Sequence, residues 1–306
     1  MKKFSSRTIF AFVCVFCTFL MFRPSLALSS ARDGVYLCLY TLIPTLFPFF
    51  VISRLLISYI TPSNRIGNLF SRLFGVSPSL LSAYIIGLIS GFPAGGAAVA
   101  QVYENGFCSR EEAERALGFC NNTGPAFAVG AVGAMLGNVK FAAVIYFLQI
   151  PSSLITSRLL PPTKATHKAP EKALSEVSLP SAVKDSMLPM ASVCAFVIFF
   201  SPLLAFIRAL LETLGAPTEV SAVILALTEL SGGIRYACTF LPLTGAFILC
   251  AFACGWSGLS VILQLRTLTG ESGLRIKYCV IGKFIQGCVC LLSAIVYLGI
   301  EKLFSM

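Results

Sequence analysis

The sequence predicts an all-α polytopic membrane protein. Of its 306 residues, 57% are hydrophobic and only 12% are charged, and the mean hydropathy is +0.86. So few charges cannot keep a soluble domain in solution. The apolar runs are about as long as a helical span, which needs roughly 20 residues. They do not alternate between apolar and polar positions, so a membrane β-barrel is excluded.

Successive apolar blocks define the expected helices. They lie at 8–30, 35–60, 79–100, 118–137, 139–160, 187–213, 219–240, 243–263 and 278–300. The first block follows the basic start MKKFSSRT and precedes the small-residue stretch SLALSSA. This pattern fits either a signal peptide or a short first span, and both place residues 31–34 outside. Residues 1–33 are therefore expected to be a signal-anchor or first transmembrane segment.

The net charge of +10 is explained by membrane orientation rather than by nucleic acid binding. The Lys and Arg residues fall in short loops, as the positive-inside rule requires, and no basic stripe is interleaved with aromatic residues. The loop after block 35–60, the polar linker 161–184 and the loop near 264–277 are basic and are expected inside. The loop 214–218 has no Lys or Arg and is expected outside. The expected surroundings are a lipid bilayer, with no nucleic acid partner.

The residues that carry chemistry form no recognisable constellation. The 12 cysteines are scattered through apolar segments, where a cysteine behaves as a small hydrophobe. Cys14 and Cys17 form a C-x-x-C inside the first apolar run, which favours buried side chains over a redox pair. The single histidine, His167, lies in the polar linker. We expect no catalytic residue, no metal site, no cofactor and no enzymatic activity.

The two halves of the chain resemble each other. NVKFAAVIYFLQ in the first half aligns without gaps on RIKYCVIGKFIQ in the second. FCNNTGPA aligns on ACGWSGLS, and the Ser-Gly of LISGFPAGG aligns on the Ser-Gly of TELSGGI. Each match is weak, but their order is the same in both halves, which indicates an internal repeat. The predicted repeats are 34–160 and 185–306, each resembling a Gate-type unit, joined by the cytoplasmic linker 161–184.

The charged loops determine how often each half crosses the membrane. If blocks 79–100 and 219–240 were full spans, loops expected on the same side would fall on opposite sides. The sides agree only if each of these blocks is a re-entrant hairpin that enters and leaves on one face. Each half then crosses three times, an odd number, so the second repeat is inverted relative to the first. Lys140 is a mild exception, because it falls on the outer side.

Each half also contains breaks within its apolar blocks. They are Ser90-Gly91-Phe92-Pro93, Gly124-Pro125, Ser231-Gly232-Gly233 and Trp256-Ser257-Gly258. Irregular backbone at membrane depth requires burial in protein or a polar cavity. Proline suits the first turn of a helix, and a half-helix that starts at mid-membrane points N–H groups and a positive dipole end inward. Such ends bind anions, and broken helices at matching places in inverted halves indicate a transporter site.

We expect the half-helix starts at Pro93, Pro125, Gly233 and Gly258 to converge on one site. The candidate substrate-binding residues are Ser90, Gly91, Pro93, Asn121, Asn122, Thr123, Gly124, Pro125, Glu229, Ser231, Gly232, Arg235, Trp256 and Ser257.

Alternative roles remain open for several of these residues. Asn121–Thr123 are expected to hydrogen-bond a polar solute, but they could instead only satisfy the broken helix. The three serines fit helix packing through small residues equally well. Glu229 and Arg235 flank the second break, where ionisable residues indicate function, although they could satisfy each other or the backbone. Arg208 and Lys283 lie nearer block ends and are expected to reach the membrane surface.

The segment ENGFCSREEAERALGF, residues 104–119, has no counterpart in the second half. Ser109 and Glu112 form a capping box, which predicts a short cytoplasmic helix. Its charges are expected on a solvated face, with a gate or a partner surface as the alternative.

These motifs together resemble the sporulation integral membrane protein YlbJ family, part of a wider nucleoside-recognition or Gate group. SGFPAGG, SREEAERALGF, CNNTGPAF, TELSGG and CGWSGLSV occur in the expected order, over about residues 34–300. The family usually has a serine in place of Thr123, and related chains often carry Thr-Asn-Gly where SGG stands here. The resemblance implies a role in endospore formation, moving dipicolinic acid across the outer forespore membrane. It also implies residence in the mother-cell membrane or outer forespore membrane, and a fold similar to concentrative nucleoside transporters.

Three functions are compatible with these features of the sequence. The first is transport of a small anion, dipicolinate, whose two carboxylates and two-fold symmetry suit a pseudo-two-fold site, with Trp256 able to stack on its ring. The second is nucleoside transport, but a nucleoside site usually presents several carboxylates or amides, and Glu229 is nearly alone in the sequence. The third is a non-transporting membrane scaffold whose breaks serve assembly.

Overall fold

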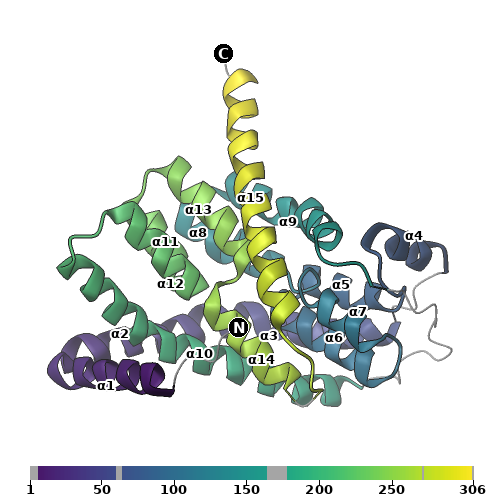
Figure 1. Ribbon diagram of the computed structural model, residues 1–306, viewed down its shortest axis with the longest axis horizontal. Coiled ribbons are helices and arrows are strands. Elements are labelled where there is room, and N and C mark those ends of the chain that lie inside the picture. Colours follow the sequence, from purple (N-terminus) through teal and green to yellow (C-terminus); the bar gives the residue numbers. More distant parts are fainter. Residues whose placement is uncertain (1–5, 60–63, 164–177, 271, 305–306) are drawn as a thin grey trace.

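The computed structural model describes residues 6–59, 64–163, 178–270 and 272–304, and every regular element within these ranges is a helix (Figure 1). Most of the linker 161–184, including His167, lies outside the described residues. The elements are α1 Ser6–Phe22, α2 Pro24–Leu37, the π-helical turn η1 Cys38–Leu42, α3 Ile43–Tyr59, α4 Asn64–Phe74, α5 Leu80–Ile89, α6 Ala94–Glu104, α7 Arg110–Ala116, the π-helical turn η2 Ala126–Val132, α8 Gly133–Leu136, α9 Val139–Leu159, α10 Leu179–Thr213, α11 Thr218–Thr228, α12 Leu230–Phe240, α13 Leu243–Trp256, α14 Gly258–Thr269 and α15 Lys277–Phe304.

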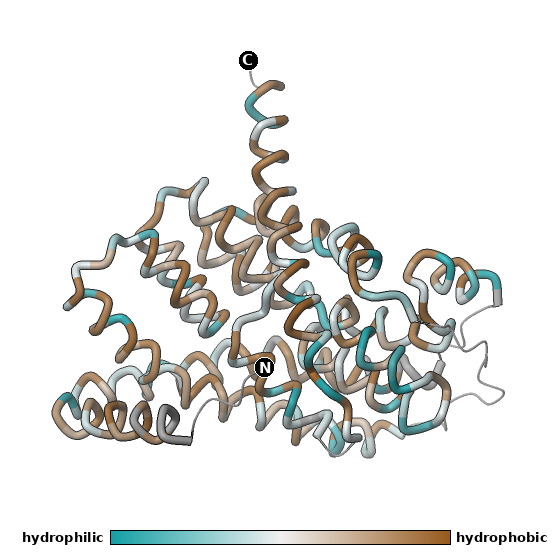
Figure 2. The backbone as a smooth tube through the Cα atoms, in the orientation of Figure 1, coloured by the Kyte–Doolittle hydropathy of each residue, from teal (hydrophilic) through white to brown (hydrophobic). Residues whose placement is uncertain are grey.

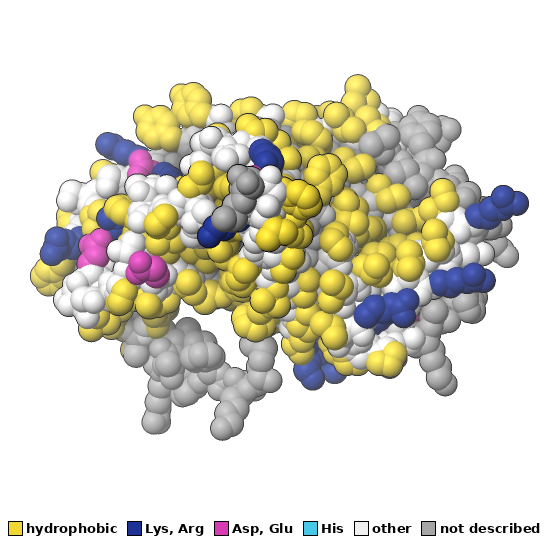
Figure 3. Space-filling model, turned by 90° about the horizontal axis from the view of Figure 1, so that it is seen from above, with side chains coloured by type: hydrophobic (Ala, Val, Ile, Leu, Met, Phe, Trp, Pro, Cys, Tyr) yellow, Lys and Arg dark blue, Asp and Glu magenta, His cyan; other side chains and the backbone are white. Residues whose placement is uncertain are grey.

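The helices have the length and composition of a polytopic membrane protein. Among the described residues, four helical segments are long and apolar enough to cross a membrane, or five if a bent pair is counted as one span. The four are Val139–Leu159, Leu179–Thr213, Leu243–Thr267 and Lys277–Phe304. On the face seen in Figure 3, hydrophobic side chains cover the middle, and Lys and Arg lie mostly toward the two ends. The predicted blocks in these regions are confirmed to within a few residues, except that α10 starts eight residues before block 187–213.

The N-terminal region differs from the prediction. The chain bends by 100° between α1 and α2, at Arg23, and Pro24 occupies the first turn of α2. Proline's fixed φ and missing N–H suit that position. Residues 31–34 lie within α2. The helix continues through η1 into α3.

Both blocks predicted to be hairpins fold as two short helices packed side by side. In the first, α5 and α6, a Cβ on Gly95 would lie 2.7 Å from the Cα of Gly87. In the second, α11 and α12, a Cβ on Gly233 would lie 2.3 Å from the Cα of Ala226. Each pair therefore touches backbone to backbone.

The break in the second hairpin lies two residues earlier than predicted. Glu229 is extended (φ −145°, ψ 133°), and its side chain caps α12. Because a carboxylate is a strong N-cap acceptor, α12 begins at Leu230, and Ser231, Gly232 and Gly233 lie inside its first turn.

The segment between the first hairpin and η2 forms the predicted short helix, α7. The surroundings of its charged side chains differ from those that were predicted. The capping box of Ser109 and Glu112 is confirmed. The prediction of a solvated charged face holds only in part, because Glu104, Arg110 and Glu111 are exposed, whereas Glu112, Glu114 and Arg115 are buried. Glu112 accepts hydrogen bonds from the backbone N–H of Ser77 (2.8 Å) and of Ser109 (2.9 Å).

Arg115 joins three chain segments at this end of the molecule. Its guanidinium donates to the carbonyls of Phe74 (3.0 Å), Gly75 (2.7 Å) and Ser157. Burial, and to a lesser degree the neighbouring Arg158, lowers the pKa of this guanidinium, which still stays charged at neutral pH. The segments 72–77, 109–115 and 157–158 therefore gather in one place. Figure 2 shows hydrophilic residues gathered around α4 and α7 and hydrophobic residues along most of α13.

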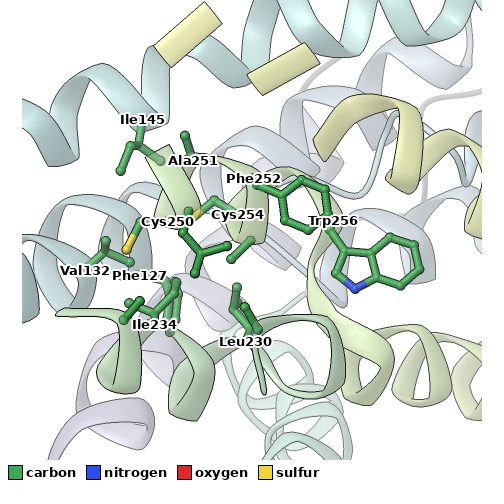
Figure 4. Close-up of a cluster of buried hydrophobic side chains, with 14 of the residues drawn as sticks. Phe127, Val132, Ile145, Leu230, Ile234, Cys250, Ala251, Phe252, Cys254 and Trp256 are labelled. Carbon is green, nitrogen blue, oxygen red and sulfur yellow. The ribbon is translucent and has the colours of Figure 1, made fainter. Parts of the chain in front are cut away.

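The largest core is built around α13. Cys250, Ala251 and Cys254 on this helix pack against residues from η2, α9 and α12. Figure 4 shows these side chains converging, with Trp256 at the edge of the cluster. The breaks in both halves thus adjoin one core that both halves build.

Candidate functional site

In both halves the tip of the hairpin packs against the broken helix that follows it. Gly91 has φ +78°, and a Cβ there would lie 2.5 Å from the backbone nitrogen of Gly124. Gly258 has φ +81°, and a Cβ there would lie 2.9 Å from the backbone nitrogen of Leu230. Only glycine combines a positive φ with so close an approach. The four predicted breaks therefore meet in two pairs, one in each half.

A glutamine holds the broken helix of the first half. Oε1 of Gln149, on α9, accepts from the backbone N–H of Thr123 (2.7 Å), and its Nε2 donates to the carbonyl of Thr123 (3.4 Å). The Thr123 hydroxyl donates to the carbonyl of Cys254 on α13 (2.9 Å). The interrupted backbone at Thr123 is thereby satisfied by protein.

A buried lysine lies at the centre of a second network. Nζ of Lys283, on α15, donates to the carbonyl of Asn121 (2.7 Å) and to Oε1 of Gln286 (2.8 Å). Nε2 of Gln286 in turn donates to Oδ1 of Asn122 (2.7 Å), and Nδ2 of Asn122 donates to the carbonyl of Phe119 (3.0 Å). Such bonds are required if Asn121–Thr123 serve only to satisfy the polar groups of the broken helix, which was the alternative role.

The expectation that Lys283 reaches the membrane surface is wrong. Its relative exposure is 0%, and no carboxylate of the described residues forms an ion pair with it. The side chain instead extends inward, where its Nζ meets the carbonyl of Asn121 and the side chain of Gln286. A buried ammonium without a counter-ion is costly, so this lysine is a residue whose importance the sequence interpretation missed.

Two of the four expected anion-binding helix ends already hold protein acceptors. At the start of α6, the N–H of Gly96 donates to Oδ1 of Asn121 (3.3 Å). At the start of α12, the carboxylate of Glu229 accepts from the N–H of Ser231 (2.9 Å) and of Gly232 (2.6 Å). These ends are therefore capped, and they are not free to bind a solute while the caps are in place.

Trp256 is fixed by packing and by a hydrogen bond. Its Nε1 donates to the carbonyl of Leu227 (3.0 Å), and its ring meets Phe284 edge to face with centroids 6.0 Å apart. Ser257, the next residue, is fully buried at the N-cap of α14.

A cavity of about 570 Å³ lies between α2, the C-terminal part of α10 and the second hairpin. Glu229, Gly232 and Arg235 line it from the hairpin. Arg208 of α10 lines it as well, 5.4 Å from the ring centroid of Tyr236 and 5.1 Å from that of Phe240. Guanidinium groups beside aromatic faces favour planar anionic solutes.

The charges in this cavity are mixed. Arg208 pairs with Glu212 at 2.7 Å, and the Glu229 carboxylate is held by backbone N–H groups. Asp33 and Arg235 also line the cavity, and neither forms an ion pair within 4 Å among the described residues. Arg235 is thus the cavity's cation that is most available to a solute.

A second cavity of about 500 Å³ lies beside the other hairpin. It is formed by α3, the first hairpin and the N-terminal part of α10, and it includes Arg54, Lys184 and Asp185. Pro189 is the last residue of α10 to line this cavity, and Ser201 is the first to line the other. Twelve residues separate them, so the two cavities lie about 18 Å apart along the helix axis.

The predicted site residues are thus divided between two environments. Glu229, Gly232 and Arg235 lie together in the larger cavity. The residues at the first-half breaks, together with Trp256 and Ser257, lie in the buried contacts between helices.

The sequence interpretation gave no binding role to Arg208, Asp33, Tyr236 or Phe240. An isolated arginine in the long apolar block 187–213 was the signal that could have identified Arg208. The described residues hold no group of three or more His, Cys, Asp or Glu side chains arranged for a metal ion.

Comparison with known proteins gives one informative match. The chain is similar to the sporulation integral membrane protein YlbJ of Bacillus subtilis (strain 168), with 25% identity over 94% of this chain and 81% of that protein. This similarity supports a YlbJ-family assignment. The resemblance to YlbJ that the motifs predicted is thereby borne out by the similarity of the chains. No family model matches the chain, and no solved structure matches it.

Proposed function

We propose that this chain is a membrane transporter for a small anion, and that its substrate during sporulation is dipicolinate. The observation that carries the proposal is the cavity beside the second hairpin, in which Arg208 and Arg235 lie with Tyr236 and Phe240. An aromatic dicarboxylate matches both features, because its ring can pack on aromatic side chains while its carboxylates pair with guanidinium groups. The similarity to a sporulation membrane protein gives the biological setting.

The proposal includes two inverted repeats, 34–160 and 185–306, of the kind found in concentrative nucleoside transporters. It is supported by the matching contacts of Gly91 with Gly124 and of Gly258 with Leu230. It is also supported by two cavities at opposite ends of α10, each beside one hairpin. The membrane would be that of the mother cell or the outer forespore membrane.

Nucleoside transport is the second candidate, and one observation favours it. The fold brings Asp33, Glu212 and Glu229 into the same cavity, so Glu229 is less isolated than it is in the sequence. However, Glu212 pairs with Arg208 and Glu229 caps α12. Only Asp33 is left to receive ribose hydroxyls, which makes the anion the better candidate.

Uptake into proteoliposomes that contain the purified protein tests the proposal. Labelled dipicolinate should enter, and unlabelled dipicolinate should compete better than picolinate, which has one carboxylate, or uridine. Arg235→Gln should raise the KM for dipicolinate about ten- to a hundredfold, because a hydrogen bond to a charged solute is lost. Arg266→Gln, near the C-terminal end of α14 and outside the cavity, is the matched control and should leave the KM unchanged.

Three outcomes decide between the candidates. Stronger competition by uridine than by dipicolinate would replace the anion by a nucleoside. An unchanged KM in the Arg235 variant would remove the cavity as the site. Absence of any transport, together with deletion spores that lack dipicolinate, would favour a scaffold that supports another carrier.

A further inference from the structure

The first turn of α14 contains buried hydroxyl groups that the fold does not use. Ser257 is the N-cap residue and Ser260 lies three residues later, and both are 0% exposed. Neither Oγ has a hydrogen-bond partner among the described residues. Buried polar groups normally find partners, so two unpartnered hydroxyls at one helix end indicate a position that something else occupies.

The backbone at this turn is also unusual. Ser257 has φ +76°, and it is the non-glycine residue with a positive φ among the described residues. The left-handed conformation is unfavourable for residues other than glycine, asparagine and aspartate. Residues held in it against this preference concentrate at functional sites. The Ser257 side chain does not cap α14, although serine is among the preferred capping residues.

The corresponding break in the first half is treated differently. There, Gln149 clamps Thr123 through both its carbonyl and its amide. In the aligned motifs NVKFAAVIYFLQ and RIKYCVIGKFIQ, the partner of Gln149 is Gln286. Gln286 does not bond to Ser257, because it is engaged with Lys283 and Asn122. The second-half break therefore lacks the clamp that closes the first.

Helix α14 contacts elements that line each of the two cavities. Gly258 touches the backbone of Glu229 and Leu230, and Glu229 lines the larger cavity. At the other end of α14, Leu265 contacts Gly96 of α6, the helix that lines the smaller cavity. The start of α14 therefore lies against the hairpin break that lines the larger cavity, and its other end lies against the helix that lines the smaller one.

We propose that the first turn of α14 binds one carboxylate group, with Ser257 and Ser260 as hydroxyl donors beside the helix's free N–H groups. This inference rests on the proposed function and adds an inner binding position to the transport path. A helix N-terminus carries about half an elementary positive charge, which favours an anionic group such as a carboxylate. Serine hydroxyls and N–H groups together match the two oxygens of that group.

The test combines a binding probe with transport kinetics. Acetate, which bears one carboxylate, should raise the melting temperature of the detergent-solubilised wild-type protein more than chloride does at the same ionic strength. The double variant Ser257→Gly plus Ser260→Ala should lose this difference. In proteoliposomes, the double variant should lower the maximal rate of dipicolinate uptake about tenfold or more, with the KM changed less than threefold, because the larger cavity beside the second hairpin is intact.

Two controls separate binding from folding. Ser257→Gly relieves the positive φ and should not lower the melting temperature without ligand. Thr269→Val removes a buried hydroxyl on the same helix that does have a partner, the carbonyl of Leu265 at 2.9 Å, and should leave both the acetate response and the uptake rate unchanged.

The outcomes keep the two proposals apart. If wild-type protein responds to acetate but transports nothing, the inner carboxylate position stands and the proposed function fails. If transport occurs but the double variant is unchanged in both assays, the inner position is wrong and the proposed function stands. An equal response of wild-type protein to chloride and acetate would also overturn the inner position, because an inorganic ion would then explain the site.

Discussion

The buried pair Lys283 and Gln286 allows a prediction in which removing the charge is milder than removing its partner. Lys283 donates to Gln286 and to the carbonyl of Asn121, with no paired carboxylate among the described residues. Three variants test the network: Lys283→Met, Gln286→Leu and the double variant.

Opposing terms set the magnitudes. Lys283→Met loses two charge-assisted hydrogen bonds, each worth about 1.5–3 kcal/mol, but it also removes the desolvation penalty of a buried ammonium, which is several kcal/mol. These terms nearly cancel, so the net change should stay within about 2 kcal/mol. Gln286→Leu leaves the ammonium buried with one acceptor, and such stranding of a charge costs about 3–5 kcal/mol. The double variant removes the stranded charge and should resemble Lys283→Met alone.

Thermal unfolding in detergent, followed by the fluorescence of the single tryptophan, Trp256, measures these changes. Gln286→Leu should lower the melting temperature by on the order of 10 °C, and Lys283→Met by a few degrees at most. The coupling between the two substitutions should be about 3–5 kcal/mol, the whole cost of Gln286→Leu, because the double variant is expected to resemble Lys283→Met alone. Lys277→Met, an exposed lysine at the start of the same helix, is the control. Additive losses in the double variant, or a larger loss for Lys283→Met than for Gln286→Leu, would refute this account of the network.

Two further predictions concern accessibility. Single cysteines introduced on a cysteine-free background can be labelled from either side of the membrane. Labelling should place residues 101–118 and 161–184 on the cytoplasmic side and residues 214–218 on the opposite side. If residues 61–77 and 101–118 are labelled from opposite sides, the first hairpin is a true span. The native thiol of Cys108, in the loop before α7, should react with maleimide about a thousandfold more slowly at pH 8 in folded than in denatured protein. Burial raises the pKa of Cys108 from 9.0 to about 12, so the reactive thiolate forms only as the pH approaches that value, and fast labelling of folded protein at pH 8 would contradict its burial.

Helix positions and breaks were largely predictable because they depend on local chemistry. Long apolar runs predicted α9, α10 and α15, and the sequence Ser90-Gly91-Phe92-Pro93 predicted the first hairpin tip. The capping box at Ser109 predicted the start of α7. Each of these signals acts within a few residues of the structure that it specifies.

What the sequence did not reveal depends on contacts between distant segments. Lys283 lies seven residues into α15, where a lysine stem could reach the surface if the helix were rotated. Its burial follows from the packing of α15 on α13 and α9, which periodicity does not encode. The buried charges of α7 were missed for the same reason, because their distant partners are backbone groups at 74–77, 157 and 275. The second hairpin break was placed two residues late because SGG is a strong breaking signal, whereas the capping carboxylate of Glu229 decides where α12 starts.

In each half the hairpin tip packs against the following broken helix, but the two junctions are satisfied differently, and this difference bears on function. In the first half, Gln149 satisfies the broken backbone and Asn121 caps the hairpin helix, so the junction is closed by protein groups alone. In the second half, Glu229 caps its helix from the wall of a cavity that also holds Arg208 and Arg235. The hydroxyls of Ser257 and Ser260 stay unpartnered within the described residues.

A scaffold would gain stability from satisfying both junctions equally, because each unsatisfied buried hydroxyl costs about 1–3 kcal/mol. A transporter needs polar groups that are free to meet its solute, and violations of local satisfaction concentrate at such sites. The unclamped junction of the second half is therefore the part of the molecule in which transport and scaffolding predict different behaviour.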